Sequence, residues 1–162
     1  MINKEFCFEE EIRDGYLVTE RVKKIWYTEI NLLIAFDRMC KEHNLKYSVC
    51  YGTLLGAIRH KGFIPWDDDL DIGMLRNDYM RFLELAPPLL SEYFELKSLY
   101  NDPGHDNVKA RIITGRHMNF SKDYLKRFHG CPYVIGIDIF PIDYINKDIV
   151  ALNEQLRIIN LI

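Results

Sequence analysis

Residues 51–74 read YGTLLGAIRHKGFIPWDDDLDIGM, and the second half of this stretch is crowded with acidic side chains. Four aspartates fall within five positions: Asp67, Asp68, Asp69 and Asp71. Carboxylates this close repel one another, because each ionised neighbour disfavours the ionised form of the next. A divalent cation relieves the repulsion, and an all-oxygen ligand set suits Mg²⁺, Mn²⁺ or Ca²⁺ better than zinc. The stretch therefore predicts a metal-dependent phosphate site.

The same residues predict a strand over Asp68–Met74. A side-chain period of two places Asp69 and Asp71 on one face and directs Leu70 and Ile72 to the core on the other. Two carboxylates at i and i+2 can converge on one or two Mg²⁺ ions, which bridge the phosphates of a nucleotide and activate an incoming hydroxyl. We predict Asp69 and Asp71 as catalytic metal ligands.

A third acid, Asp138, lies in a second apolar run, Tyr133–Phe140, with isoleucines on both sides of it. An isolated buried carboxylate is costly, so this side chain must point out of the apolar layer or be paired. If the run forms a strand beside Asp68–Met74, Asp138 becomes the third metal ligand. In that position it could also help to deprotonate an acceptor hydroxyl.

The first half of the stretch predicts a phosphate-binding helix start. Gly52 and Thr53 form a predicted turn, with Thr53 as the N-cap of a short helix that runs to about His60. Free backbone N–H groups at a helix start bind anions such as a diphosphate. Arg59, His60 and Lys61 follow and could neutralise phosphate charge, so we predict that Gly52, Thr53 and these three residues bind phosphate.

The rest of the chain has the pattern of one α/β (α+β) domain with a sheet flanked by helices. Apolar residues recur at helical spacing over Thr19–His43, and Leu45–Cys50 alternates as a half-buried strand does. Further expected elements are a helix over Asp78–Ala86 capped by Asn77, strands over Phe94–Tyr100, Val108–Ile113 and Tyr133–Phe140, the last ending at Pro141, and a helix from Asp148 onward.

That last helix carries an apolar stripe, and the sequence ends inside it. A face this apolar should be buried, either over the sheet, which we expect, or against another copy of the chain in an oligomer. We also expect residues 1–162 to be a single domain that lacks C-terminal elements found in similar domains.

Composition excludes several classes of protein. The 162 residues are 48% hydrophobic with a net charge of −3, which argues against a nucleic-acid partner. Neither an N-terminal signal peptide nor an apolar run long enough for a membrane span is evident. Four widely spaced cysteines predict reduced thiols, so we expect a cytoplasmic protein.

One local charge excess leaves two interpretations open. Residues 105–129 contain six Lys or Arg against two acids. Within them, Lys109 and Arg111 share one face of a predicted strand, where they could bind phosphate or face solvent.

The stretch quoted above, together with the later GIDIFPID, resembles the LicD family of phosphotransferases, which also includes the fukutin-related proteins. The resemblance runs from about Thr19 to Asp143. It implies a nucleotidyltransferase-like mixed sheet flanked by helices, with a Gly-Thr turn, paired aspartates and a later third aspartate around Mg²⁺.

Carried over to this chain, the resemblance implies that Gly52 and Thr53 form the turn, Asp69 and Asp71 the pair, and Asp138 the third ligand. It implies transfer of a phospho-alcohol, such as phosphocholine or ribitol phosphate, from a CDP-linked donor to a glycan acceptor. That acceptor would be a cell-surface glycan or its precursor, such as lipopolysaccharide or teichoic acid, and the cofactor would be Mg²⁺ or Mn²⁺.

Two rival functions stay open at this point. A glycosyltransferase also uses an Asp-x-Asp pair with Mn²⁺ to hold a nucleotide-sugar, although the Gly-Thr turn fits the first interpretation better. A catalytically silent domain would bind a nucleotide without turnover.

Overall fold

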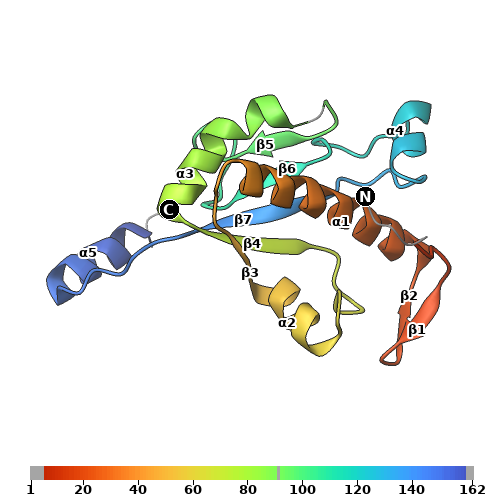
Figure 1. The fold of residues 1–162 in the computed structure, drawn as a ribbon, viewed down its shortest axis with the longest axis horizontal. Helices are drawn as coiled ribbons and strands as arrows, with labels where there is room; N and C mark the ends of the chain where they lie inside the picture. The colour runs from red at the N-terminus through yellow and green to blue at the C-terminus, as the bar shows by residue number, and fades with distance from the viewer. Residues whose placement is uncertain (1–5, 91, 160–162) are drawn as a thin grey trace.

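The computed structural model describes residues 6–90 and 92–159 as one mixed sheet with helices packed around it (Figure 1). The strands of this sheet are β3 (Ser48–Val49), β4 (Leu70–Leu75), β5 (Glu95–Lys97), β6 (Ala110–Ile113) and β7 (Gly136–Ile142). Around it lie α1 (Glu20–Glu42), α2 (Tyr51–Arg59), α3 (Arg76–Leu85), the short 3₁₀ helix η1 (Pro87–Leu89) and α4 (Lys122–Arg127). A separate hairpin consists of β1 (Glu11–Arg13) and β2 (Tyr16–Val18), and α5 (Ile149–Ile159) lies beyond the end of β7 (Figure 1).

The sheet has the strand order β3-β4-β7-β6-β5. β4 and β7 are parallel neighbours, and the other pairings are antiparallel. Asp71 of β4 lies directly opposite Asp138 of β7. The predicted fold class, a mixed sheet flanked by helices, is confirmed, and the two strands that carry the aspartates are adjacent.

One face of the sheet forms the core. Leu70, Ile72 and Met74 of β4 are buried there, with Ile137 and Ile139 of β7. They pack against the apolar stripes of α1 and α3 in one cluster that contains Leu32, Phe36, Met39, Tyr79 and Phe82. The prediction that Leu70 and Ile72 face the core is confirmed, and the alternate residues of β4 and β7 project from the opposite face.

The long first helix matches its prediction within one residue at each end. Thr19 is its N-cap, and the Thr19 hydroxyl accepts a hydrogen bond from the Val22 N–H. The helix ends at Glu42 with His43 as its C-cap, and Asn44 adopts a positive φ of 51°, a conformation that an asparagine tolerates better than most residues. Local capping chemistry therefore sets both ends.

Other boundaries differ from the predictions. α2 begins at Tyr51 after Cys50, so Thr53 is not its N-cap, and α3 begins at Arg76, so Asn77 is not a cap either. β7 continues through Pro141 to Ile142. Pairing with β6 ends at Ile139, so Pro141 has a partner strand on one side only and its missing N–H is tolerated.

The last helix, α5, projects beyond the end of β7 and away from the sheet (Figure 1). Three of its apolar side chains are largely exposed: Ile149 at 66%, Val150 at 73% and Leu156 at 48%. The prediction that this helix packs over the sheet is wrong. The chain continues past the sheet after β7 and then turns, and α5 runs back along the segment that follows β7 (Figure 1), where the Gln155 side chain contacts Tyr144 and Asn146. Burial against a second copy stays a prediction.

Two composition-based expectations can be set beside the structure. No helix within residues 6–90 and 92–159 combines the length and the apolarity that crossing a membrane requires. All four cysteines are free thiols, of which Cys40 and Cys131 are buried and Cys50 is half-buried.

Candidate active site

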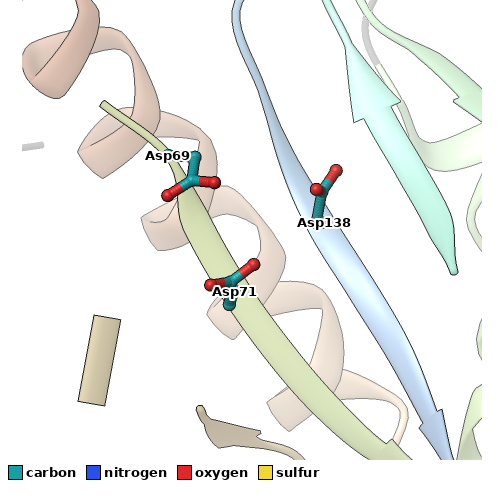
Figure 2. Close-up of side chains that lie close together, drawn as sticks. All are labelled: Asp69, Asp71 and Asp138. Carbon is teal, nitrogen blue, oxygen red and sulfur yellow. The ribbon is translucent and has the colours of Figure 1, made fainter. Parts of the chain in front are cut away.

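Three aspartates meet on the sheet face opposite the core (Figure 2). Asp69 directly precedes β4, Asp71 lies in β4, and Asp138 lies in β7. One carboxylate oxygen from each lies within 4.8 Å of the others. Asp71 and Asp138 are buried, whereas Asp69 is exposed. The structure thus brings together the three residues that the sequence singled out, and their role as metal ligands stays a prediction.

Burial and neighbouring negative charge raise the pKa values of Asp69 and Asp71. Burial, followed by the charges of Asp71 and Asp67, raises the pKa of Asp69 to about 6. Burial and the charge of Asp138 also raise the pKa of Asp71, against an opposing effect of the Lys109 ammonium. Negative charge at this site is therefore incompletely neutralised by the protein, and its donors are all carboxylate oxygens. Both properties fit a hard divalent cation such as Mg²⁺ or Mn²⁺.

The start of α2 is joined to the aspartates through β4. The Thr53 hydroxyl accepts a hydrogen bond of 2.7 Å from the Asp71 N–H, and the Cys50 N–H donates to the Asp71 carbonyl at 3.1 Å. Thr53 was predicted as a helix cap, but its hydroxyl instead holds the backbone of Asp71. This contact fixes the position of α2 relative to the candidate metal ligands.

Gly52 makes room for an acidic side chain. A Cβ at this position would lie 2.5 Å from Asp67 Oδ2, so any larger residue would displace that carboxylate. Gly52 and Thr53 line a small hollow together with Asp67 and Asp69. The predicted Gly-Thr pair therefore does lie beside the acidic cluster, in the first turn of α2 rather than in a turn before it.

The loop that carries Asp67 and Asp68 is held in place by Trp26 of α1. The Trp26 indole N–H donates a 2.7 Å hydrogen bond to the Asp67 carbonyl. The Trp26 ring also stacks on Phe63, with centroids 4.9 Å apart and planes 7° apart. These contacts fix the loop that leads into Asp69 and β4.

The basic residues after α2 lie at the far end of that helix. Six residues separate Arg59 from Thr53, which corresponds to about 9 Å along a helix axis. His60 Nδ1 lies 2.8 Å from Asp14 Oδ2 of the β1–β2 turn, and Lys61 Nζ donates to the Ile58 carbonyl at 3.0 Å. Within the described residues, no hydrogen bond or ion pair joins these three to the aspartate cluster, and their role in phosphate binding stays a prediction.

Two other basic residues contact the aspartate cluster directly. Lys109 Nζ donates a hydrogen bond to Asp138 Oδ2, and Arg111 Nε donates to Asp138 Oδ1 at 2.7 Å. The sequence left these side chains open between phosphate binding and solvent. In the structure they pair with the third aspartate because β6 lies beside β7 with Arg111 opposite Asp138.

Glu29 of α1 was missed by the sequence analysis. The residue is 1% exposed, and no residue that the structure describes donates a hydrogen bond to its Oε2 atom. Burial, followed by the charges of Asp69 and its neighbours in the acidic loop, raises the pKa of Glu29 to about 10. The available signal was its position four residues after Ile25 and three before Leu32, on the apolar stripe of the helix.

Comparison with known proteins assigns the family. A sequence model described as "LicD/FKTN/FKRP, nucleotidyltransferase domain" matches residues 44–153. The lipopolysaccharide cholinephosphotransferase LicD of Haemophilus influenzae is 44% identical over 69 residues, which are 43% of this chain and 26% of that protein. An uncharacterized protein of Rickettsia typhi is 35% identical over 98 residues, covering 57% of this chain and 32% of the relative.

A second uncharacterized protein, from Rickettsia prowazekii, is 40% identical over 77 residues, covering 44% of this chain and 29% of the relative. The chain thus spans about a quarter to a third of the length of the curated relatives it matches. The family match itself covers more than half of the chain and includes α2, all three aspartates and both strands that carry them. This chain therefore belongs to the LicD/FKTN/FKRP nucleotidyltransferase-domain family.

Proposed function

We propose that this chain is a nucleotidyltransferase-type domain of a phosphotransferase that moves phosphocholine, or a related phospho-alcohol, from a CDP-linked donor to a glycan. The observation that carries the proposal is the convergence of Asp69, Asp71 and Asp138 in a member of this family. The similarity to the lipopolysaccharide cholinephosphotransferase of Haemophilus influenzae supports choline phosphate as the transferred group and lipopolysaccharide as the acceptor.

The aspartates are proposed to hold Mg²⁺ or Mn²⁺. Their carboxylate oxygens match the ligand preference of these ions. Burial, together with neighbouring negative charge that a cation would neutralise, raises the pKa values of Asp69 and Asp71. When bound, such an ion neutralises donor phosphate and makes an incoming hydroxyl more acidic.

The chain's own groups would supply orientation. The Thr53–Asp71 hydrogen bond and the β4–β7 register hold two of the carboxylates in place before any ligand arrives. The free N–H groups in the first turn of α2, at Gly52 and Thr53, would bind a donor phosphate beside Asp67 and Asp69. Asp138, directly opposite Asp71, would accept the proton of the acceptor hydroxyl.

The compartment and the extent of the domain are part of the same proposal. Four free cysteines fit a reducing environment, so the cytoplasm is the expected compartment. We take residues 1–162 as one nucleotidyltransferase domain.

A ligand screen tests the donor class. Thermal unfolding would be followed with CDP-choline, CDP-ribitol, CDP-glycerol and UDP-sugars, each with and without Mg²⁺ or Mn²⁺. A ligand at 100 times its Kd stabilises the folded state by about 2.7 kcal/mol, so a metal-dependent shift with a CDP-linked compound is expected.

The other outcomes identify the rivals. Stabilisation by UDP-sugars but by no CDP-linked compound would contradict the proposal and favour a glycosyltransferase. Binding of a CDP-linked compound without transfer to any glycan acceptor would indicate a catalytically silent domain.

A further inference from the structure

Charged residues form one row across the sheet face that carries the aspartates. The strand register places Lys97 of β5, Arg111 of β6, Asp138 of β7 and Asp71 of β4 side by side in that order. The side chains of this row are basic on β5 and β6 and acidic on β7 and β4. A ligand with negative charge that is bound at the aspartates through a cation would therefore lie next to basic side chains on β6.

Both carboxylate oxygens of Asp138 accept hydrogen bonds from basic side chains. Lys109 holds Oδ2 and Arg111 holds Oδ1, and the Lys109 ammonium also lies 5.3 Å from the centre of the Phe140 ring. The Asp138 side chain is only 8% exposed, whereas that of Arg111 is 46% exposed. The carboxylate is thus fixed in the sheet, while the guanidinium has open space to move into.

Coordination of a cation by Asp138 conflicts with this arrangement. The cation would have to share an oxygen with the Lys109 ammonium or the Arg111 guanidinium, and its two positive charges repel both groups. Asp138, Lys109 and Arg111 together carry a formal charge of +1, and a divalent cation bound by Asp138 adds two more positive charges beside the two basic groups. Bound metal alone is therefore opposed by these side chains, and a phosphate restores the balance.

We propose that Lys109 and Arg111 form the subsite for the phosphates of a nucleoside diphosphate, and that cation binding at Asp138 releases them to bind it. This inference rests on the proposed function, and it adds phosphate contacts from Arg111 of β6 and from Lys109, which directly precedes β6, to those proposed for the first turn of α2. Ammonium and guanidinium groups form strong charge-assisted hydrogen bonds with phosphate, and the guanidinium can bind two oxygens at once.

The proposal requires opposite effects on two affinities. Replacing Lys109 by Met and Arg111 by Gln removes the competitors of the cation, so Mn²⁺ alone should bind about tenfold tighter. The same double variant, saturated with Mn²⁺, should bind CDP at least about tenfold more weakly, because two charge-assisted hydrogen bonds are lost. Calorimetric titration of each ligand measures both effects without an activity assay.

Arg116→Gln is the matched control. Arg116 pairs with Asp102 at 3.0 Å, away from the aspartate cluster, so this variant should leave both affinities unchanged. Arg111→Gln alone keeps Lys109 on Asp138, and it provides the same test with smaller shifts if the double variant does not fold.

The outcomes separate this inference from the proposed function. Tighter Mn²⁺ binding together with weaker CDP binding supports it. Unchanged or weaker Mn²⁺ binding, or unchanged CDP binding, in variants of a wild-type protein that binds both ligands overturns the inference alone. A wild-type protein that binds no Mn²⁺ overturns the proposed function as well.

Discussion

The two faces of β4 differ in almost every property, although they alternate along the same six residues. Ile72 and Met74 face α1 and α3 and are fully buried among apolar side chains. Asp71 faces the other way, beside Asp138, where burial and like charge raise its pKa. The core face stabilises the fold, whereas the aspartate face costs stability until its charge is neutralised. Substitutions on the two faces should therefore have separable effects.

The largest effect is expected on the aspartate face. Asp71→Asn should lower transfer activity by roughly 10³-fold, about 4 kcal/mol, because it removes a carboxylate proposed to bind the metal. The free energy of unfolding without metal should stay the same or rise, since like-charge repulsion is relieved. Activity on a verified donor and urea unfolding measure the two quantities. Near wild-type activity would remove Asp71 from the site.

The matching change on the core face should act in the opposite way. Ile72→Ala creates a cavity at a fully buried position and should lower the free energy of unfolding by about 2–5 kcal/mol. The affinity of the remaining folded protein for Mn²⁺ should be close to that of the wild type. A large loss of Mn²⁺ affinity with little loss of stability would show that the two faces are not separable in this way.

Variants of Glu29 test how burial and the nearby acidic cluster lower the stability of the folded protein as pH rises. Its folded pKa is raised from 4.5 to about 10, so the folded state keeps a proton that the unfolded state loses as pH rises above 4.5. Its contribution to stability is therefore present below pH 4.5 and is lost progressively as pH rises toward 10. Glu29→Gln should stabilise the protein at pH 8 by about 1–3 kcal/mol. The glutamine amide is neutral at every pH in this range, so folding no longer requires that a carboxyl group bind a proton.

Thermal unfolding from pH 5 to 9 checks this prediction. The melting temperature of metal-free wild type should fall with pH more steeply than that of Glu29→Gln. Glu42→Gln, at an exposed position of the same helix, is the control and should retain the wild-type slope. Equal slopes for all three proteins would contradict the prediction.

Metal affinity should depend on pH through Asp69. Its pKa is raised to about 6 in the metal-free protein, and the proton must leave before the carboxylate can bind a cation. Mn²⁺ affinity should therefore be nearly constant above pH 7 and fall by up to about tenfold per pH unit below 6. Without metal, the same raised pKa lowers stability as pH rises from about 4 to 6. A flat affinity between pH 5 and 7 would exclude Asp69 as a ligand.

The smallest effect is expected on α5. Val150 is 73% exposed, so Val150→Ala should change the free energy of unfolding by less than about 0.5 kcal/mol, compared with several kcal/mol for Ile72→Ala. Urea unfolding at two protein concentrations measures it. A large loss, or a loss that appears only at high concentration, would show that α5 is buried against another chain.

The sequence-based predictions were accurate where the structure depends on neighbouring residues and less accurate where it depends on contacts between residues far apart in the chain. Period-two alternation correctly placed Leu70 and Ile72 in the core, and the first helix begins at Glu20, one residue after its predicted start at Thr19. The position of Asp138 required an assumption about which strands are neighbours. The packing of α5 was predicted wrongly, because an apolar stripe shows that a face favours burial but not where the chain turns after β7.

The sequence by itself determined the chemistry of the site: an Asp-x-Asp pair on a strand, a third acid in an apolar run, and a Gly-Thr pair before them. These are local patterns whose meaning depends on a few neighbouring residues. Only the tertiary structure decided which charges meet. Lys109 and Arg111 contact Asp138 because β6 pairs with β7 in one register, and Glu29 lies under the acidic loop because α1 crosses that end of the sheet. Strand order and helix packing arise from contacts between residues far apart in the chain, which no local pattern contains.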